Sequence, residues 1–360
     1  MKKENTISGL LEISKQGHGF TRQPKNNFLP SVDDAFVPPT LIKKFKLREG
    51  VLLEALLQEN KGRGKNKPIA EILKVNGLPP EKFASIPEIK SLTSIDPFER
   101  LVTKQDENDI TGCVIDLFTP LAKGTRGLII SPPKAGKTTI LKHLAQSVLQ
   151  NYPEVEVMIL LVDERPEEVT DFRRTVKADV YFSSSDQSVE NHLRIARLTM
   201  AMAIRKVEMG KDVLVLIDSL TRMGRAFNKE TNTRGRTMSG GLDARALEVP
   251  RQFFGAARKI ENGGSLTILA TILVNTGSRM DDIIFQEFKG TGNMELVLSR
   301  ACADRRIFPA VNLRESGTRK EHKILSADLL EKSHKLRRYL MNFDEVEAMQ
   351  KLLNSVKEIC

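Results

Sequence analysis

The chain has 360 residues, which is enough for one large core and a smaller second domain. Its formal charge is +10, and residues 1–80 alone hold 14 basic against 8 acidic residues, so a polyanionic partner is favoured. Cysteine and histidine residues lack the spacing of zinc ligands, and no apolar run is long enough to cross a bilayer. The short apolar stretch near the N-terminus is interrupted by Glu12, so we expect no signal peptide. The three cysteines lie far apart without a Cys-x-x-Cys pair, which fits reduced thiols and a cytoplasmic location.

Residues 1–75 contain short strand-like segments separated by turn residues, a pattern typical of a small β-barrel. Phenylalanines in this region are interleaved with lysines and arginines. Because bases stack on aromatic rings while cations follow the phosphate backbone, this pattern is typical of proteins that bind single-stranded nucleic acid. A phenylalanine in a small barrel is also a common core residue, and this alternative stays open for each ring. The rings are Phe20, Phe28, Phe36 and Phe45, and the cations are Arg22, Lys25, Lys43, Lys44 and Lys46.

Residues 76–105 contain Pro79, Pro80, Pro87 and Pro97 among polar residues, and we expect a linker that lies along the next domain. In residues 106–360, near-continuous apolar strands alternate with helices, which is typical of a parallel sheet covered on both faces. The end of the chain, from Ser326 onward, is predicted to be helical.

A phosphate-binding loop is predicted where an apolar strand is followed by a turn and a helix. The segment reads GLIISPPKAGKTT from Gly127 to Thr139. Backbone N–H groups at a helix N-terminus bind phosphate oxygens, and the helix dipole favours their negative charge. The Lys137 ammonium can reach the β and γ phosphates, and the Thr138 hydroxyl can bind Mg²⁺. A plain strand–helix turn with a surface lysine is the alternative.

Two further predicted strands end in acidic residues. Asp218 follows VLVLI and fits the residue that holds Mg²⁺ through water, and Glu164 fits the carboxylate that polarises the attacking water. An acidic residue at a strand end is also a common helix cap. The guanine-reading Asn-Lys-x-Asp motif is absent, because Asn228-Lys229 is followed by Glu230, so ATP is preferred over GTP.

Two irregular stretches follow the later strands. Residues 231–242 are rich in glycine and arginine, and residues 275–293 contain Arg279 and the glycine-rich FKGTGN turn. We expect both to be long loops that contact a phosphate backbone. An ordinary surface loop is the alternative for each stretch. Arg319 lies beyond the last strand, where an arginine can project into a neighbouring subunit's site and stabilise the transferring phosphate.

Several segments together resemble the bacterial transcription termination factor Rho family. They include LLVDERPEEVTDF, VLIDSLTR, TMSGGLDARAL, DDIIFQEFKGTGNMELVLSR and RIFPAVNLRESGTRKE. The resemblance implies a RecA-like P-loop ATPase core preceded by an OB-fold (cold-shock-like) domain. It also implies a homohexamer that uses ATP and Mg²⁺ to move 5′→3′ on nascent single-stranded RNA, unwinds RNA–DNA hybrids and acts on the RNA polymerase elongation complex.

The resemblance assigns roles to individual positions. It makes Glu164 the catalytic base, Arg165 an arginine switch, Arg319 an arginine finger and Phe308 the ring that packs on adenine. The implied nucleotide-binding residues are Thr125, Arg126, Gly127, Lys134, Ala135, Gly136, Lys137, Thr138, Thr139, Arg165, Asp218 and Phe308, with Thr138 and Asp218 at Mg²⁺.

The resemblance also implies two RNA sites. The primary site comprises His18, Gly19, Phe20, Thr21, Arg22, Asp34, Ala35, Phe36 and Ile69, and the secondary site comprises Thr237, Met238, Ser239, Gly240, Gly241 and Arg279. Three primary-site positions depart from the family pattern: His18 and Ile69 replace aromatic residues, and Phe36 replaces a tyrosine. The barrel is expected to start at about residue 7, without the helical bundle that usually precedes it. Since stacking contributes about 1–3 kcal/mol per base, the loss of two rings is expected to weaken primary-site binding.

Two other functions share parts of this pattern. A ring ATPase of the protein-export or rotary class would have the same core, but it would not need the interleaved rings and cations of residues 20–46. An RNA-binding module with an inactive motor would not need the full set of motor residues, which are Lys137, Thr138, Glu164, Asp218 and Arg319.

Overall fold

An antiparallel sheet that closes on itself forms the N-terminal domain of this computed structural model, which describes residues 5–58, 66–231, 241–243 and 245–359. Its strands run in the order β3-β2-β1-β4-β5. A bridge between Phe36 and Pro68 brings the two outer strands together, as expected for a small barrel. Along β4, Leu53 and Ala55 point into the core while Leu52 and Glu54 face outward, following the two-residue period of a strand. The strands are β1 (Thr6–Ile13), β2 (Gly19–Arg22), β3 (Phe36–Val37), β4 (Leu52–Leu57) and β5 (Ile69–Val75).

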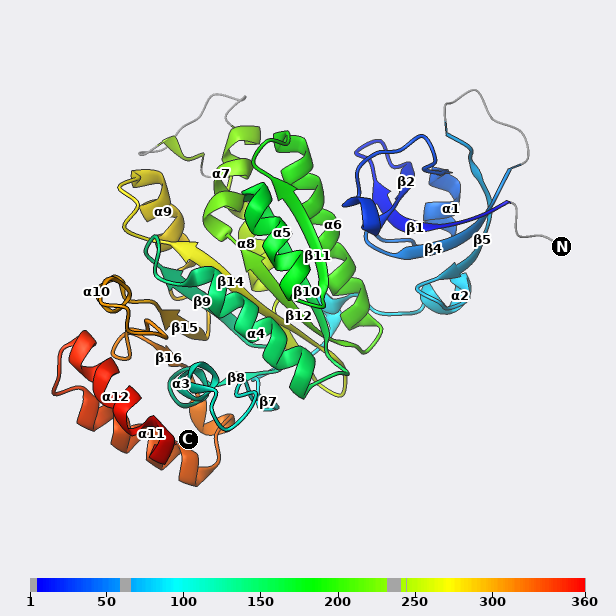
Figure 1. Cartoon of the computed structure of the whole chain (residues 1–360). Helices are drawn as coiled ribbons and strands as arrows, with labels where there is room; N and C mark the ends of the chain where they lie inside the picture. The colour runs from blue at the N-terminus through cyan, green and yellow to red at the C-terminus, as the bar shows by residue number, and fades with distance from the viewer. Residues whose placement is uncertain (1–4, 59–65, 232–240, 244, 360) are drawn as a thin grey trace.

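Short elements cross from the barrel to the second domain. Helix α1 (Pro39–Lys44) lies between β3 and β4 of the barrel domain. Helix α2 (Pro80–Phe83) comes after β5, and its Phe83 is buried in the barrel core. Strand β6 (Ser94–Ile95) pairs with β13 (Arg258–Ile260), and β7 (Arg100–Leu101) pairs with β8 (Leu121–Ala122). These pairings hold the connecting segment against the second domain (Figure 1).

The second domain is built on a nine-stranded sheet whose main path is β11-β10-β12-β14-β9-β15-β16. All neighbours from β11 to β15 are parallel, and β16 and β13 add antiparallel edges. The strands are β9 (Arg126–Ser131), β10 (Glu156–Glu164), β11 (Asp179–Ser184), β12 (Asp212–Asp218), β14 (Ser265–Leu273), β15 (Met294–Val297) and β16 (Gly317–Thr318).

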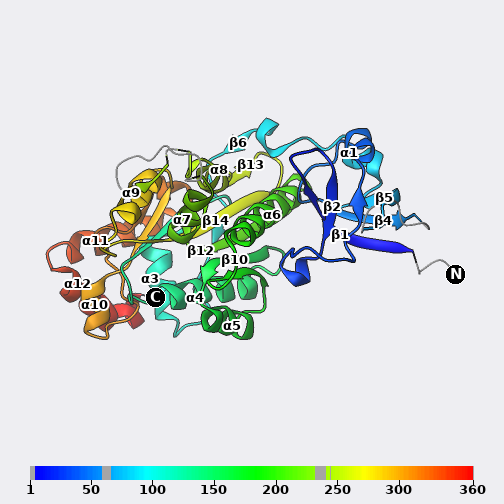
Figure 2. The ribbon, with the colours of Figure 1, turned by 90° about the horizontal axis from the view of Figure 1, so that it is seen from above.

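Helices cover both faces of this sheet, as predicted. In β9, Leu128 and Ile130 pack into one apolar core and Ile129 packs into the other. The first core contains α6, α7, α8 and α9, and the second contains α3, α4, α5 and α12. Figures 1 and 2 place the barrel and the C-terminal helices α11 and α12 at opposite ends of the molecule. The helices are α3 (Ile110–Phe118), α4 (Lys137–Asn151), α5 (Pro166–Thr175), α6 (Val189–Glu208), α7 (Leu220–Thr231), α8 (Glu248–Gly255), α9 (Arg279–Phe288), α10 (Arg300–Asp304), α11 (Ala327–Leu340) and α12 (Glu345–Ile359).

One predicted loop is wrong in part. Residues 275–293 were expected to be irregular, but α9 occupies the middle of this stretch. Asp281 and Asp282 lie in its first turn, where negative charge stabilises a helix, and Ile284 and Phe288 are buried one turn apart. The apolar spacing therefore outweighs the flanking glycines.

Candidate nucleotide and RNA sites

The turn before α4 has the backbone of a phosphate-binding loop. Lys134 and Gly136 have φ angles of 63° and 95°, in the left-handed region that glycine enters freely. A Cβ at Gly136 would meet nothing within 4 Å, so the need for glycine is conformational. Helix α4 begins at Lys137, which leaves its first N–H groups free to bind phosphate oxygens.

The other predicted loop residues lie on the same turn. Ala135 is buried, Thr138 is half-buried and Thr139 is exposed. Arg300 of α10 donates from Nη1 to the carbonyl of Pro133 at 2.6 Å. This bond ties the segment after β15 to the phosphate loop.

Lys137 reaches across the carboxyl edge of the sheet to two acidic residues. Glu164 ends β10 and Asp218 ends β12, and these two strands are neighbours. Lys137 Nζ lies 3.4 Å from Glu164 Oε1 and forms an ion pair with Asp218 Oδ1. The structure thus brings together the three side chains that the sequence assigned to the phosphate, the water and the metal ion.

Glu164 is 1% exposed, and its surroundings raise the pKa of its carboxyl. Burial raises the pKa of its carboxyl above the ordinary 4.5, and the negative charge of Asp218 raises it further. Lys137 and Arg222 oppose the rise. A carboxylate with a raised pKa is suited to accept a proton from water near neutral pH.

Arg222, on α7, was not identified from the sequence. Its Nη2 lies 3.0 Å from Glu164 Oε2, and its Nη1 donates to the Asp163 carbonyl at 2.6 Å. The pairing register of β10 shifts between Val162 and Glu164, a bulge that re-aims the strand end. Its position in the sequence could have indicated this role, because Arg222 lies one helical turn after Asp218 and therefore at the same edge of the sheet.

Asp218 has one free acceptor for a cation. Its Oδ1 accepts a hydrogen bond from the Thr271 hydroxyl at 2.9 Å. Its Oδ2 is buried and has no hydrogen-bond partner among the residues that the structure describes. A buried carboxylate oxygen without a donor fits Mg²⁺ or its bound water, and Thr138 supplies a hydroxyl on the adjacent helix turn.

Of the remaining residues predicted to act on the nucleotide, Arg165 and Phe308 follow strands at the carboxyl edge of the sheet, and Arg319 does not. Arg165 is exposed at the N-cap of α5, next to Glu164, and Phe308 is 49% exposed in the segment after α10. Both follow strands at the carboxyl edge. Arg319 is exposed and lies elsewhere, after β16.

Residues 125–127 were predicted to bind the nucleotide, but they lie far from the phosphate loop of their own chain. Thr125, Arg126 and Gly127 lie at the amino end of β9, whereas the phosphate loop follows its carboxyl end. At about 3.3 Å per residue, the strand separates them by roughly 17 Å. Thr125 and Arg126 adjoin Arg319 instead, and these three residues are among those that line a hollow of about 280 Å³. Thr125 is itself buried, and its hydroxyl accepts from the Ala122 N–H at 2.9 Å.

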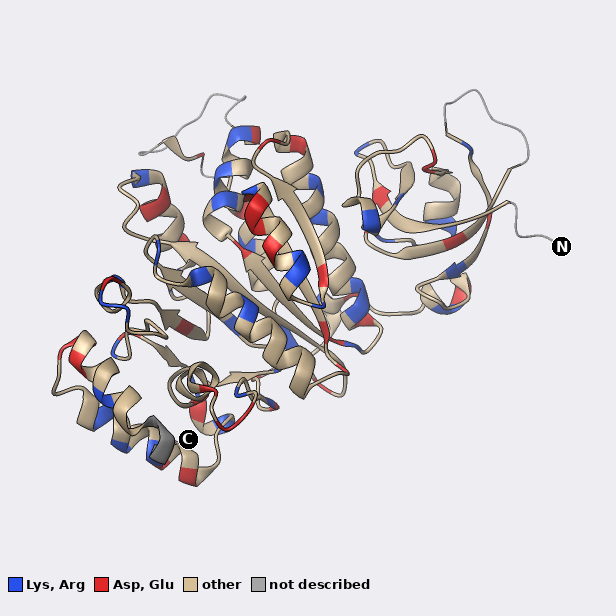
Figure 3. Cartoon of the chain, viewed as in Figure 1, with Lys and Arg blue, Asp and Glu red and all other residues tan. Residues whose placement is uncertain are grey.

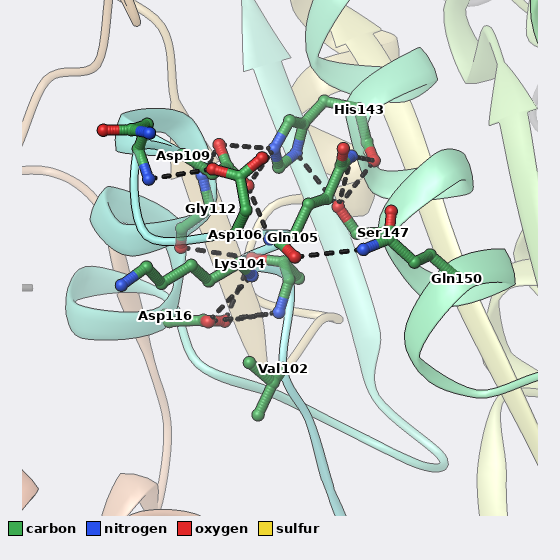
Figure 4. A network of polar contacts seen from close by, with 12 residues as sticks. Val102, Lys104, Gln105, Asp106, Asp109, Gly112, Asp116, His143, Ser147 and Gln150 are labelled. Carbon is green, nitrogen blue, oxygen red and sulfur yellow. Dashed lines mark hydrogen bonds and ion pairs between the residues drawn. The ribbon is translucent and has the colours of Figure 1, made fainter.

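A half-buried network of hydrogen bonds holds α4 against α3 and the segment before it (Figure 4). His143 Nε2 lies 2.8 Å from Asp109 Oδ2, and Asp109 also accepts from the Gly112 N–H at the start of α3. Gln105 Nε2 donates to the Ser147 hydroxyl at 3.0 Å. The phosphate-loop helix is therefore fixed at its middle as well as at its start.

On the barrel, an imidazole and two benzene rings form a half-buried cluster. The His18 ring centroid lies 5.5 Å from those of Phe20 and Phe36, and the two phenylalanine rings lie 5.7 Å apart. The Arg22 guanidinium lies 5.1 Å from the Phe20 centroid. We call His18, Phe20 and Phe36 the ring cluster; these half-buried rings can stack on bases.

Several predicted primary-site side chains are instead part of the barrel interior. Ile69 is 1% exposed and packs in the core, so the prediction that it contacts RNA is wrong. Arg22 is paired with Glu12 and Asp34, which leaves it little freedom to follow a phosphate backbone. Thr21, Asp34 and Ala35 are buried, and Gly19 lies in the ladder between β1 and β3.

The other two barrel phenylalanines also differ from each other. Phe28 is fully buried and stacks on Tyr181 of β11, with centroids 5.3 Å apart. It joins the barrel to the second domain and is not a platform for a base. Phe45 is half-buried, with Lys44 Nζ 4.9 Å from its centroid, so its stacking role stays a prediction.

The predicted secondary site is described only in part. Thr237, Met238, Ser239 and Gly240 lie outside the described residues. The Gly241 carbonyl accepts from Asn228 Nδ2 at 2.9 Å, which anchors this segment to α7. Arg279 is exposed at the start of α9. Basic and acidic residues are interspersed along the ribbon of both domains (Figure 3). None of the described helices has the length and apolar character needed to cross a bilayer.

Known families match both domains. Residues 7–81 match the Rho termination factor, RNA-binding domain, and residues 112–318 match the ATP synthase alpha/beta family, nucleotide-binding domain. The chain is 48% identical to transcription termination factor Rho of Aquifex aeolicus over 355 residues, or 98% of this chain and 81% of that protein. It is 46% identical to the Haemophilus influenzae protein of the same name over 351 residues, or 97% of this chain and 84% of that protein.

Two solved structures share the fold at lower identity. One is a prototypical ATPase from the type III secretion system of pathogenic bacteria, with a TM-score of 0.62, 21% identity and 72% of each chain covered. The other is an ATP synthase subunit from Nanoarcheaum equitans, with a TM-score of 0.59, 17% identity and coverage of 75% of this chain and 71% of that one. The relatives that match nearly the whole chain, and the matched RNA-binding domain, identify the family more specifically than this shared core does. The chain therefore belongs to the transcription termination factor Rho family, with an RNA-binding domain followed by an ATP-hydrolysing domain.

Proposed function

We propose that this protein is a homohexameric, RNA-stimulated ATPase that moves 5′→3′ along nascent RNA, unwinds RNA–DNA hybrids and releases transcripts from RNA polymerase in the cytoplasm. The observation that carries the proposal is the contact of Lys137 with Glu164 and Asp218 in a chain whose barrel presents the ring cluster. The first feature supports ATP hydrolysis, and the second supports a single-stranded RNA effector.

Each residue at the carboxyl edge has a role in hydrolysis. The N–H groups at the start of α4 bind phosphate oxygens, and Lys137 neutralises the charge that develops on the transferring phosphate. Glu164 orients the attacking water and accepts its proton, aided by its raised pKa. Arg222 holds the second oxygen of that carboxylate, so that Oε1 faces Lys137.

Mg²⁺ would be held by Asp218 and the Thr138 hydroxyl, and when bound it would offset negative charge on the phosphates. Phe308, half-exposed at the same edge, is suited to pack on the adenine ring. Lys134 is an exposed cation within the loop, Arg165 is an exposed cation directly after Glu164, and both are proposed to contact phosphate oxygens.

Arg319 is proposed to act on the nucleotide of the neighbouring protomer. It lies near the amino end of β9, away from its own phosphate loop, and is exposed. Within the described residues its side chain has no ion pair or hydrogen bond. A free arginine at this place can complete a site at a subunit boundary and would stabilise the transition state there.

The test is a titration of ATPase rate against poly(C), poly(U) and single-stranded DNA. We expect low basal turnover that rises strongly with pyrimidine-rich RNA. Lys137→Ala should abolish hydrolysis, and Arg319→Ala should abolish it while ATP binding is retained. Mixing the two inactive variants should restore activity, because mixed interfaces pair an intact Lys137 with an intact Arg319.

A ring ATPase of the protein-export or rotary class is the second candidate, since its core fold is shared. It would hydrolyse ATP at a rate that RNA does not change. Turnover that stays flat with all three polymers would therefore contradict the RNA-dependent motor and favour this class.

A further inference from the structure

The loop that carries Arg319 is attached to the segment that connects the two domains. Asp96 follows β6 in that segment, and its two carboxylate oxygens lie 2.9 and 3.0 Å from Lys320 Nζ. Lys323 Nζ lies 2.7 Å from Asp96 Oδ2. One carboxylate thus holds two cations of the loop, and one of them is the residue directly after Arg319.

We infer that Asp96 is a positioning residue, which holds the 319–323 loop so that Arg319 is correctly placed for the nucleotide of the neighbouring protomer. This inference rests on the proposed function, in which Arg319 acts at the subunit boundary. It adds a residue of the connecting segment to the machinery of hydrolysis.

The backbone on both sides of Asp96 is bonded to the second domain. Ile95 pairs with Lys259 of β13, and the Glu261 N–H donates to the Thr93 carbonyl at 3.0 Å. Glu99, three residues further on, pairs with Lys259 Nζ at 2.7 Å. Because both sides of Asp96 are bonded to the second domain, its carboxylate is a fixed point for the loop.

Asp96 holds the loop close to Arg319, and a second contact, between Glu321 Oε1 and His334 Nε2 of α11 at 2.7 Å, holds it further along. The backbone N–H of Arg319 donates to the Asn293 carbonyl at 2.7 Å, and this is its last ladder contact. Lys320 then has a left-handed backbone with φ of 56° and begins the short 3₁₀ turn Glu321–Lys323. The guanidinium of Arg319 has no partner of its own in the described chain, so its direction depends on how this turn is held.

The electrostatics agree with this geometry. Hydrogen bonds from Lys323 and then Lys320 lower the pKa of Asp96 to about 2, so the carboxylate is charged throughout the physiological range. Exposed ion pairs contribute little to folding stability. Catalysis responds more steeply, since a displacement of about 1 Å can cost up to about 100-fold in rate.

The test compares kcat and KM for ATP at saturating RNA in full-length variants. We expect Asp96→Asn to lower kcat about tenfold with KM and melting temperature unchanged, and Asp96→Glu to restore much of the loss. Glu331→Gln is the matched control, because Glu331 is an exposed acid that pairs with Lys335 at 2.6 Å within α11 and has no hydrogen bond or ion pair to the 319–323 loop among the described residues. It should leave kcat unchanged.

Mixing assays show where the defect acts. Asp96→Asn subunits have an intact phosphate loop, so Lys137→Ala subunits should raise their activity above the average of the two separate proteins. Wild-type kcat in Asp96→Asn, or a loss that mixing does not relieve, would overturn the inference. If Arg319→Ala itself keeps wild-type kcat, the proposed role of Arg319 fails and the role of Asp96 fails with it. An inactive Arg319→Ala beside a fully active Asp96→Asn would reject Asp96 alone.

Discussion

Phe28 and Phe36 look alike in the sequence, since each lies among cations in the barrel segment, but they have opposite surroundings. Phe28 is fully buried and stacks on Tyr181 at an interplanar angle of 17°. Phe36 is half-buried in the ring cluster. We therefore predict that Phe28→Ala lowers stability and spares RNA affinity, whereas Phe36→Ala lowers RNA affinity with a smaller effect on stability.

The magnitudes follow from these surroundings. Replacing a fully buried phenylalanine by alanine costs about 3–5 kcal/mol, and the stacked ring pair contributes about 0.5–1.5 kcal/mol of that loss. Folded proteins have only about 5–15 kcal/mol of stability, so the Phe28→Ala loss should be large. Removing a stacking ring costs about 1–3 kcal/mol per base, so Phe36→Ala should weaken RNA binding by about 5- to 150-fold.

Two measurements on the full chain check this prediction. Guanidinium unfolding reports stability, and fluorescence anisotropy with a short pyrimidine RNA reports affinity for the barrel. Phe28→Leu serves as a milder variant, so that affinity is measured on folded protein. If changes at Phe28 weaken RNA binding as much as Phe36→Ala while stability stays constant, the assignment of Phe28 to the domain junction is refuted.

Three further predictions concern the motor. Glu164→Gln should lower kcat by about 10²–10⁴-fold, with Glu167→Gln as the neutral neighbouring control. Because burial raises the pKa of Glu164 above the ordinary 4.5, ionisation of this carboxyl destabilises the fold, and thermal melts at pH 8 should find the variant more stable than wild type. This gain should shrink as the pH falls from the raised pKa toward 4.5 and vanish below 4.5. Gly136→Ala should lower stability by about 1–2 kcal/mol and weaken ATP binding, because alanine disfavours the left-handed backbone at this position. An unchanged affinity for ATP in isothermal titration calorimetry would contradict this prediction. Burial disfavours the charge on Asp109, but hydrogen bonds from backbone N–H groups and from His143 outweigh this effect and lower its pKa below 3.8. Asp109→Asn should therefore destabilise the fold fully at neutral pH, and this loss of stability should shrink as the pH falls below 3.8. An equal loss at pH 7 and pH 3 in urea unfolding would contradict the prediction.

The sequence located the phosphate loop and both strand-end carboxylates because short-range patterns specify them. A buried strand followed by a glycine turn and a helix requires only local backbone preferences, and Glu164 and Asp218 each follow an apolar run directly. The helix α9 was missed because glycines on both sides suggested a loop, although Ile284 and Phe288 have helical spacing.

The resemblance to a family transferred residues without regard to their surroundings. It placed Ile69 at the RNA site, but the barrel closes with that side chain inside. It placed Arg126 at the nucleotide, but within one chain this residue lies at the other end of β9, beside Arg319. Both corrections concern which side or end of a strand a residue occupies, and that depends on the neighbouring strands.

The sequence by itself therefore determined the order of the domains, the alternation of strands and helices, and the chemical groups at the ends of β9, β10 and β12. These features depend on contacts between residues that are near each other in the chain. Only the tertiary structure decided which rings face solvent, that Arg222 supports Glu164, and that the segment between the domains holds the Arg319 loop. Those outcomes arise from packing between segments far apart in the sequence, where the burial of one side chain is set by partners that no local pattern encodes.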